Sequence, residues 1–461
     1  RALGDIHFCF LSQLAYNSEI LSKFVLGKPS PHERRLSATK TMTKMQYRIT
    51  APDTFDTAVN LPPSKSVSNR ALVIHALSHG DIIPQNLSEC DDTEVMINAL
   101  NGNDTVVDIK AAGTAMRFLT AYYAATPGEH ILTGTPRMKQ RPIALLVDAL
   151  RYLGADIEYM ENEGFPPLRI KGRPLEGGYI EIPGNVSSQY ISALLMIGPV
   201  LKNGLQLRMT GEVVSKPYID LTLWTMREFG ADADWTDADV VSVGAKPYSQ
   251  RRYTIESDWS AASYWYEMMA LCPDREARLG FKGLHDASKQ GDSVVKYIFS
   301  LLGVKTRFDR RDGDEAVAVK LKKQPTFLPR LDYDFIGSPD LAQTVVVTCC
   351  LMNIPFRFTG LASLRIKETD RLEALRAQLA QLGFNIEIAD DSILSWDGTA
   401  GEAAAYPRIL TYDDHRMAMA FAPAAIRFPS LTVLDAGVVS KSYPDYWRHL
   451  ALAGFKMEVA K

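Results

Sequence analysis

Polar side chains that can bind anions stand at the start of six segments that are apolar on nearly every side. Such segments are typical of buried helices. A helix N-terminus has unpaired backbone amides and a partial positive charge, so it favours anions. The polar residues at these starts include Lys65, Ser66, Arg70, Thr114, Arg117, Ser187, Ser188, Gln189, Asp340, Asp414, His415 and Arg416. If the starts face one cleft, they form a site for a ligand that carries several negative charges.

Serine and aspartate at these positions have a second interpretation, because both are ordinary N-caps. Lysine and arginine do not fit it, since a cap must accept a hydrogen bond. Two further basic clusters, Arg137 to Pro142 (RMKQRP) and Arg365 to Leu372 (RIKETDRL), also precede predicted helices. In the second cluster, Thr369 or Asp370 is the expected cap. Arginine can hold carboxylate or phosphate through two parallel hydrogen bonds, although a solvated charge run explains either cluster when it is considered alone.

The composition argues against several classes of protein and ligand. The 51 basic and 54 acidic residues give a formal charge of −3, so nothing favours nucleic acid or an anionic membrane surface as a partner. The chain contains no run of about 18 uncharged apolar residues, which argues against a membrane span. The five cysteines form no CxxC pair, which argues against a zinc knuckle or a disulfide framework. A cytoplasmic protein is therefore expected.

The first 45 residues differ in character from the rest of the chain. They begin with Arg1 and include a run rich in serine, arginine and proline from Ser30 to Thr41. A targeting presequence and a non-native leader are both open interpretations, although acidic residues are atypical of a presequence. We expect residues 1–45 to be a leader that is disordered or foreign to the native protein, with Met42 or Met45 as the true start.

Two kinds of helix alternate along the remainder of the chain and would position the polar clusters. One kind is amphipathic, ends at a glycine that supplies a left-handed residue, and is followed by a short alternating strand. The other kind is the apolar segment with the polar start. At 461 residues the chain exceeds what one core usually supports. We therefore predict six α/β units in two domains of three, although a generic α/β protein with coincidental spacing is the alternative. The helix-ending glycines are Gly102, Gly154, Gly230, Gly303, Gly383 and Gly454.

Seven motifs together resemble the 5-enolpyruvylshikimate-3-phosphate synthase family of enolpyruvyl transferases. They are LPPSKSVSNRAL, AGTAMRFL, LTGTPRMKQRP, SSQYISALLM, VSKPYIDLT, RIKETDRL and DDHRMAM, in the family's order. The resemblance covers residues 46 to 461. It implies a two-domain inside-out α/β barrel, with three repeats of a β-α-β-α-β-β unit in each domain and closure of the domains on substrate. It also implies that residues 46–63 and 257–461 form a discontinuous first domain, while residues 64–256 form the second.

The resemblance further implies a reaction and its substrates. The enolpyruvyl (carboxyvinyl) group of phosphoenolpyruvate would pass to the 5-hydroxyl of shikimate-3-phosphate, with release of phosphate through a tetrahedral intermediate. This is a step of the shikimate pathway to chorismate and the aromatic amino acids. No metal and no organic cofactor is expected, and the enzyme is expected to act as a monomer.

Site residues follow from the family's motifs position by position. Asp340 matches the base for the attacking hydroxyl and Glu368 the proton donor and acceptor at the methylene carbon, while Lys65 and Lys441 assist. The positions that match shikimate-3-phosphate contacts are Lys65, Ser66, Arg70, Ser187, Ser188, Gln189, Ser215, Tyr218, Asp340, Ser363 and Lys367. Those that match phosphoenolpyruvate contacts are Lys65, Gly113, Arg141, Gln189, Arg371, Arg416 and Lys441.

Three positions depart from the family pattern. The family often has asparagine where this chain has Ala111 and proline where it has Phe118, and Ser363 replaces a further asparagine. These changes affect the expected phosphate contacts and the response to inhibitors that pack against Gly113, and leave the reaction class unchanged.

Two other functions fit part of the pattern. A UDP-N-acetylglucosamine enolpyruvyl transferase would share the fold and the chemistry, but that family typically carries a mobile-loop cysteine that TGTPRMKQRP lacks. A non-catalytic repeat scaffold could bind anions. It would have no reason to keep Asp340 and Glu368 beside an anion, so a phosphate-release assay separates the two cases.

Overall fold

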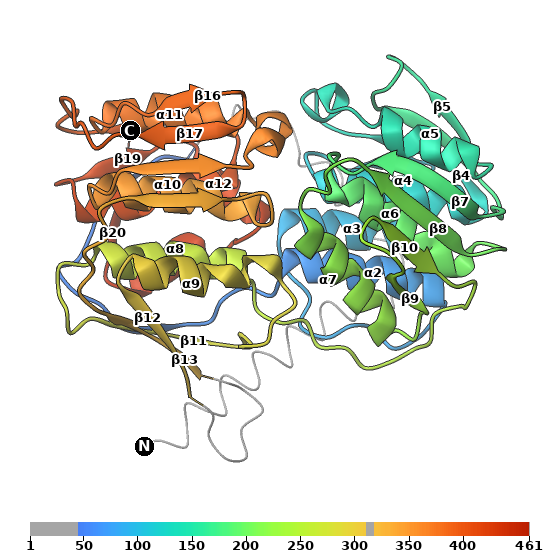
Figure 1. Cartoon of the computed structure of the whole chain (residues 1–461), viewed down its shortest axis with the longest axis horizontal. Helices are drawn as coiled ribbons and strands as arrows, with labels where there is room; N and C mark the ends of the chain where they lie inside the picture. Colours follow the sequence, from blue (N-terminus) through green and yellow to red (C-terminus); the bar gives the residue numbers. More distant parts are fainter. Residues whose placement is uncertain (1–44, 310–317, 461) are drawn as a thin grey trace, which may run out of the picture. The chain divides into compact units, whose positions relative to one another are not determined.

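The computed structural model describes residues 45–309 and 318–460. The expected leader, residues 1–45, lies outside the described residues except for Met45. Within the described residues, no helix is long and apolar enough to cross a membrane. Figure 1 shows a chain built from helices and small sheets, which repeat one plan.

The plan consists of a strand, a buried helix, a parallel strand, a surface helix and a final hairpin. In one example, β8 pairs parallel with β7 and antiparallel with β10, which gives the sheet order β7-β8-β10-β9. This unit comprises β7 (Gly178–Pro183), α6 (Ser188–Ile197), β8 (Leu205–Thr210), α7 (Lys216–Glu228), β9 (Ala233–Trp235) and β10 (Val240–Val243). The parallel pair needs a crossover, and the buried helix supplies it.

Two further units follow the same plan, and each is formed by one continuous stretch of the chain. The first comprises β3 (Val106–Asp108), α4 (Gly113–Ala125), β4 (Gly128–Thr133), α5 (Ala144–Tyr152), β5 (Asp156–Tyr159) and β6 (Leu168–Gly172). The second comprises β14 (Leu331–Asp334), α10 (Ala342–Leu351), β15 (Phe356–Thr359), α11 (Arg371–Gln381), β16 (Glu387–Ala389) and β17 (Ile393–Trp396).

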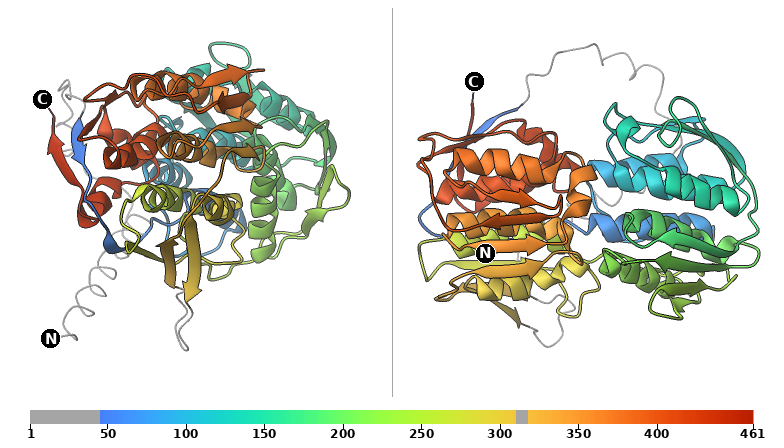
Figure 2. Two further views of the ribbon diagram at one scale, coloured as in Figure 1. Left: turned by 60° about the vertical axis from the view of Figure 1, so that its left-hand side comes forward. Right: turned by 45° about the horizontal axis from the view of Figure 1, so that its top comes forward.

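In two other units, one strand comes from a distant part of the chain. The strand β2 (Asp56–Val59) pairs parallel with β11, and β1 (Tyr47–Thr50) lies between β19 and β20. Figure 2 shows the blue β1 beside the red β20. The remaining members are α8 (Trp259–Leu271), β11 (Arg278–Lys282), α9 (Val295–Leu301), β12 (Val304–Asp309) and β13 (Ala318–Lys323), then β18 (Arg408–Ile409), α12 (His415–Phe421), β19 (Leu431–Val433), α13 (Tyr446–Leu452) and β20 (Lys456–Val459).

The sixth unit differs from the predicted one. It contains α2 (Lys65–Ser78) and α3 (Asp91–Asn101), but in the described chain its strands are reduced to a parallel bridge between Gln85 and Thr254. Pro84 has no amide to donate, and Asn86 has a φ of 57°, so neither suits a regular strand. The Asn86 side chain instead donates to the Ile255 carbonyl at 2.7 Å. The described residues thus form five four-stranded sheets rather than six.

The helices with polar starts are buried, as predicted. Every residue of α10 and α12 is buried, and so is every residue of α8 except Ser260. Among these three helices, α10 contacts both α8 and α12. The helices α2, α4 and α6 form a second group, in which each helix contacts the other two. Figure 1 shows the first group in the yellow-to-red part of the chain and the second in the blue-to-green part. The mixed α/β class with buried helices is therefore confirmed.

Five of the six helix-ending glycines have the predicted left-handed backbone, with φ between 82° at Gly230 and 102° at Gly154. The prediction is wrong for Gly102, whose φ is −80°. There the chain leaves α3 in an extended conformation, and a Cβ atom would lie 2.8 Å from the Asn98 carbonyl oxygen. Glycine fits here because it has no Cβ atom to collide with the Asn98 carbonyl.

We propose that the chain forms two domains, residues 46–63 with 257–461 and residues 64–256. Strand pairing supports the division, because three sheets take all their strands from residues 45–63 and 257–460, and two take theirs from residues 64–256. The antiparallel bridge between Pro63 and Ser257 lies where the chain crosses from one segment to the other.

Candidate active site

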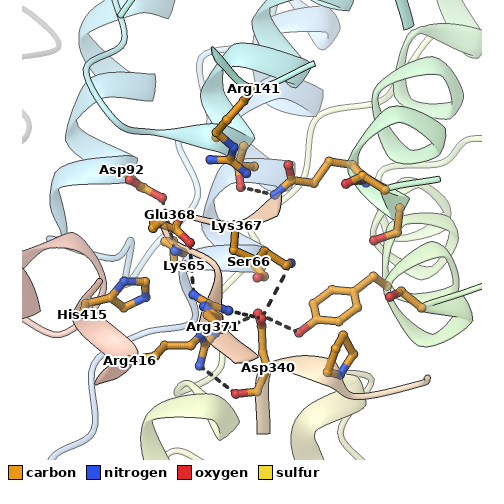
Figure 3. Close-up of a pocket in the computed structure, with 18 of the residues that line it drawn as sticks. Lys65, Ser66, Asp92, Arg141, Asp340, Lys367, Glu368, Arg371, His415 and Arg416 are labelled. Atoms are coloured by element: carbon orange, nitrogen blue, oxygen red, sulfur yellow. Dashed lines mark hydrogen bonds and ion pairs between the residues drawn. The ribbon is translucent and has the colours of Figure 1, made fainter. Parts of the chain in front are cut away.

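One pocket is lined by nearly all of the residues that the motifs single out (Figure 3). It includes residues of both the 64–256 and the 257–460 segments, and most of them stand at the starts of helices. The lining residues are Lys65, Ser66, Arg70, Asp92, Gly113, Thr114, Arg141, Ser187, Ser188, Gln189, Ser215, Tyr218, Pro339, Asp340, Lys367, Glu368, Arg371, His415 and Arg416.

Helix caps hold several of these side chains in place. Ser187 accepts a hydrogen bond from the Gln189 amide at 3.3 Å, and Asp414 accepts one from the Arg416 amide at 2.9 Å. Asp370, one of the two expected caps of α11, accepts from the Leu372 and Glu373 amides. These caps fix the helix starts at which Gln189, Arg371 and Arg416 stand.

Asp340 lies in a 3-10 turn before α10 and is surrounded by positive charge. Its Oδ2 lies 2.8 Å from Arg416 Nη2, and its Oδ1 lies 3.1 Å from Arg371 Nη1. Lys367 Nζ is 3.7 Å from Oδ1. Burial acts to raise the pKa of this carboxyl, but the neighbouring cations, led by Arg416, hold the pKa well below its usual value. Asp340 is therefore ionised.

Glu368 stands just before α11 and is bound from two sides. Its Oε1 lies 3.0 Å from Lys441 Nζ, and its Oε2 lies 3.0 Å from Arg371 Nη2. Burial again acts to raise the pKa, but Lys441 and Arg371 hold it well below its usual value. Lys441 is not part of the pocket lining and lies behind Glu368, where it also donates to the Ala111 carbonyl at 2.6 Å.

Arg371 joins the two candidate catalytic carboxyls. It is 1% exposed, and its guanidinium contacts both Asp340 and Glu368 (Figure 3). Its Nε donates to Asp414 Oδ2 at 2.7 Å, which fixes the side chain from behind. A buried charge of this kind needs several partners, because desolvation is costly. The arrangement places the carboxyls on neighbouring nitrogens of one rigid group.

Lys65 brings a further positive charge from the start of α2. Its Nζ lies 3.2 Å from Asp92 Oδ2, and its backbone amide donates to Asp258 Oδ2 at 3.3 Å. Asp92 was not among the predicted site residues. It stands in the first turn of α3, where acidic residues are common because they stabilise the helix. Asp92 also lies 3.9 Å from Lys441 Nζ, so it bridges two of the predicted cations.

Arg141 and Gly113 pack closely together at another wall of the pocket. A Cβ atom on Gly113 would lie 2.5 Å from Arg141 Nη1, so only glycine leaves room for the guanidinium. Arg141 Nε is buried and has no hydrogen-bond partner within the described chain. Arg117, one turn into α4, donates to the Gly113 carbonyl at 3.3 Å and to the Pro142 carbonyl at 3.0 Å. Arg141 therefore keeps donor capacity for an anion.

Two of the predicted shikimate-3-phosphate contacts, Arg70 and Ser363, are not simply free side chains in this pocket. Arg70 lines the pocket, but its donors are engaged with Thr222 Oγ1 at 2.7 Å, the Ser66 carbonyl at 2.9 Å and Ser192 Oγ at 3.2 Å. Ser363 lies outside this pocket and lines an adjoining one. That adjoining pocket shares Arg141, Ser187, Ser188, Gln189, Ser215 and Lys367 with the main pocket.

The described residues contain no group of three or more histidine, cysteine, aspartate or glutamate side chains that could hold a metal ion. His415 lines the pocket, and burial holds its pKa well below the usual value, so the ring is neutral. Neither of its nitrogens has a hydrogen-bond partner within the described chain.

Comparison with known proteins agrees with this geometry. The model of the EPSP synthase (3-phosphoshikimate 1-carboxyvinyltransferase) family matches residues 49–102 and 99–450. A 3-phosphoshikimate 1-carboxyvinyltransferase of Bacteroides fragilis is 58% identical over 417 residues, which cover 90% of this chain and 100% of the relative. Another, of Vibrio atlanticus, is 36% identical over 422 residues, or 86% of this chain and 96% of the relative.

Two solved structures share the fold. The structure of an EPSP synthase from Acinetobacter baumannii aligns with a TM-score of 0.72 at 22% identity, over 90% of this chain and 100% of that one. The enolpyruvyl transferase NikO from Streptomyces tendae aligns with a TM-score of 0.67 at 15% identity, over 91% of this chain and 100% of that one.

Proposed function

The chain belongs to the EPSP synthase (3-phosphoshikimate 1-carboxyvinyltransferase) family, and we propose that it uses Asp340 and Glu368 for this family's chemistry. It transfers the enolpyruvyl group of phosphoenolpyruvate to the 5-hydroxyl of shikimate-3-phosphate and releases phosphate, in the route to the aromatic amino acids. The alternative acceptor, UDP-N-acetylglucosamine, is not favoured. The observation that carries the assignment of roles is that Arg371 holds both carboxyls in one pocket rich in positive charge.

The reaction needs an acid, a base and cations, and the pocket has candidates for each. Glu368 would protonate the methylene carbon of phosphoenolpyruvate, which makes the neighbouring carbon electrophilic. Asp340 would take the proton of the 5-hydroxyl as its oxygen bonds to that carbon. Loss of phosphate, which leaves with the proton that Asp340 had taken up, together with return of a methyl proton to Glu368, restores the double bond and the starting state of both carboxyls. Atoms and charges balance without a cofactor.

The low pKa values of Asp340 and Glu368 indicate how a bound substrate would change the site. Asp340 pairs with both Arg371 and Arg416, and Glu368 and Asp414 pair with Arg371 as well. A bound phosphate or carboxylate group would share these cations, which weakens their effect on the carboxyls and raises both pKa values. Glu368 could then take up the proton that it gives to the methylene group.

The substrates would divide the pocket between them. Arg141, Arg371 and Arg416 are the proposed clamp on phosphoenolpyruvate, supported by the Arg141 Nε, which has no hydrogen-bond partner within the described chain, and by the close packing of Gly113. The start of α6 and that of α7 are the proposed shikimate-3-phosphate site. Their members are Ser187, Ser188, Gln189, Ser215 and Tyr218, with Lys367 opposite.

We also propose that the enzyme acts as a monomer in the cytoplasm, and that its two domains close on substrate. One chain supplies all the lining residues of the pocket, which supports a monomer. The four cysteines among the described residues are free and buried, which fits a reducing compartment. Contacts between the segments, such as Arg137 Nε to the Glu368 carbonyl at 3.2 Å, are candidates for change during closure.

Phosphate release on mixing the two substrates, with each omitted in turn, tests the proposal. The wild-type protein should release phosphate only with both present. Asp340→Asn and Glu368→Gln should each lower turnover by about 10²- to 10⁴-fold, while shikimate-3-phosphate still binds in a calorimetric titration. Glu387→Gln, on the exposed face of β16, is the matched control and should keep wild-type turnover. Near-normal turnover in either site variant would remove that residue from the mechanism.

A further inference from the structure

A second buried carboxyl, Asp292, lies close to Asp340 and has no part in the mechanism above. It stands in the 3-10 turn Gly291–Val294 before α9 and is 3% exposed. Its Oδ1 accepts a hydrogen bond from the Tyr218 hydroxyl at 3.3 Å, and its Oδ2 accepts one from Ser260. Within the described chain its hydrogen-bond partners are hydroxyl groups rather than cations. Asp292 does not line the pocket, so it can affect a ligand only through another residue.

Tyr218 is the residue that connects Asp292 with the pocket. Its hydroxyl lies 3.3 Å from Asp292 Oδ1 and 3.4 Å from Asp340 Oδ2. A phenol has one hydrogen to donate, and both distances are long for a hydrogen bond. The hydroxyl is therefore shared between the two carboxyls, and removing either one changes where it points.

The start of α7 packs between the turns that carry these two carboxyls. A Cβ atom on Gly291 would lie 2.6 Å from Pro217 Cβ, so the turn beside Asp292 approaches α7 as closely as glycine allows. On the other side, the Ser215 amide donates to the Ile336 carbonyl at 2.9 Å. Residues 215–218 belong to one sequence segment and residues 291–340 to the other. The hydroxyl of Tyr218 thus marks a contact between segments.

The two carboxyls differ in how their charge is balanced. Asp340 has three cations within 4 Å, while Asp292 has none among its hydrogen-bond partners. Burial and the nearby charge of Asp340 raise the pKa of Asp292 to about 6, and Arg416 opposes this effect. At neutral pH Asp292 is still mostly ionised, so it competes with Asp340 for the Tyr218 hydrogen. Hydrogen bonds to ionised groups are the stronger ones.

We propose that Asp292 is a positioning residue that orients the Tyr218 hydroxyl, and with it the start of α7, for the acceptor substrate. The inference rests on the proposed function, because Tyr218 and Ser215 belong to the proposed shikimate-3-phosphate site and Asp340 is the proposed base. Ser260, in the first turn of α8, fixes the other oxygen of Asp292. The pair Asp292 and Ser260 therefore ties Tyr218 to a buried helix of the opposite segment.

A double-mutant cycle between Asp292→Asn and Tyr218→Phe tests the proposal. Asp292→Asn should raise KM for shikimate-3-phosphate by about 3- to 10-fold, because it weakens one hydrogen bond to a charged group. The values of kcat and of KM for phosphoenolpyruvate should stay within about twofold. In the Tyr218→Phe background, the same substitution should change KM by less than about twofold, since the connecting hydroxyl is gone. Asp332→Asn, at an exposed position of β14, is the matched control and should have no effect in either background.

Ser260→Ala gives a second route if Asp292→Asn does not fold. It frees the other carboxylate oxygen, and its smaller rise in KM should also vanish in the Tyr218→Phe background. Effects of equal size in both backgrounds, for either variant, would overturn the positioning role. So would an unchanged KM in the single variants. Asp340→Asn, measured in parallel, separates the two claims, because normal turnover there contradicts the proposed function whatever the cycle shows.

Discussion

The tight packing of Gly113 against Arg141 makes one substitution especially informative. In Gly113→Ala the new Cβ would lie 2.5 Å from Arg141 Nη1 and 3.0 Å from Nη2. The guanidinium must withdraw by about 0.9 Å to reach an ordinary contact of 3.4 Å. A misplacement of about 1 Å in a substrate-positioning group can cost about 10²-fold. We therefore expect KM for phosphoenolpyruvate to rise by about 10- to 100-fold.

The same substitution should leave the fold and the acceptor site unchanged. The atom displaced is the end of a long side chain, and alanine is the better helix former by about 0.5–1 kcal/mol, so stability should not fall. KM for shikimate-3-phosphate should stay within about threefold, because the acceptor is assigned to other residues. Gly437→Ala is the matched control, since a Cβ at Gly437 meets nothing within 4 Å.

Steady-state kinetics with each substrate varied in turn, together with urea unfolding, gives all of these quantities. An unchanged KM for phosphoenolpyruvate in Gly113→Ala would refute the assignment of Arg141 to the clamp. A large decrease in the free energy of unfolding would refute the claim that the Arg141 guanidinium can move away from the new Cβ atom.

Two further predictions concern the charged cluster. Asp414→Asn leaves the buried Arg371 charge without its closest carboxylate and should lower the free energy of unfolding by about 3–5 kcal/mol; a loss below about 1 kcal/mol in denaturant unfolding would contradict this. The pKa of Glu368 is lower in the folded than in the unfolded chain, where it is about 4.3. Its ion pairs therefore stabilise the fold fully above that pH and progressively less as the pH falls below it. Glu368→Gln should accordingly flatten the dependence of unfolding free energy on pH between about 5 and 3, and identical slopes in variant and wild type would argue against the pairing.

The sequence alone was sufficient for the parts of the fold and site that depend on local pattern. Segments that are apolar all round are typical of buried helices, and α10 and α12 are buried at every residue. Lys65, Glu368 and Arg416 were found because they sit in motifs at helix starts. Lysine and arginine could not be explained as caps, and the family resemblance supplied the candidate roles, including that of Glu368.

Features set by tertiary contact could not be predicted. Asp92 and Asp292 have no unusual neighbours in the sequence, and only the fold brings them beside Lys65 and Tyr218. The insertion of β1 between β19 and β20 joins residues from opposite ends of the described chain. No periodicity reveals this pairing, and only the family resemblance implied that residues 46–63 join residues 257–461. The sixth unit lacks a sheet at a place where single residues such as Pro84 do not suit a strand. A proline is tolerated in an edge strand and excluded from a central one, so its effect cannot be known until the neighbouring strands are known.

The role of Glu368 as the group that protonates the methylene carbon can be tested by running the reaction in D₂O and analysing the product by mass spectrometry. A carboxyl that exchanges with solvent between turnovers should deliver deuterium to the methylene carbon, so the transferred enolpyruvyl group should carry it. Glu368→Gln should lose this incorporation together with turnover. Product formed at the normal rate in D₂O without deuterium in the enolpyruvyl group would contradict the account.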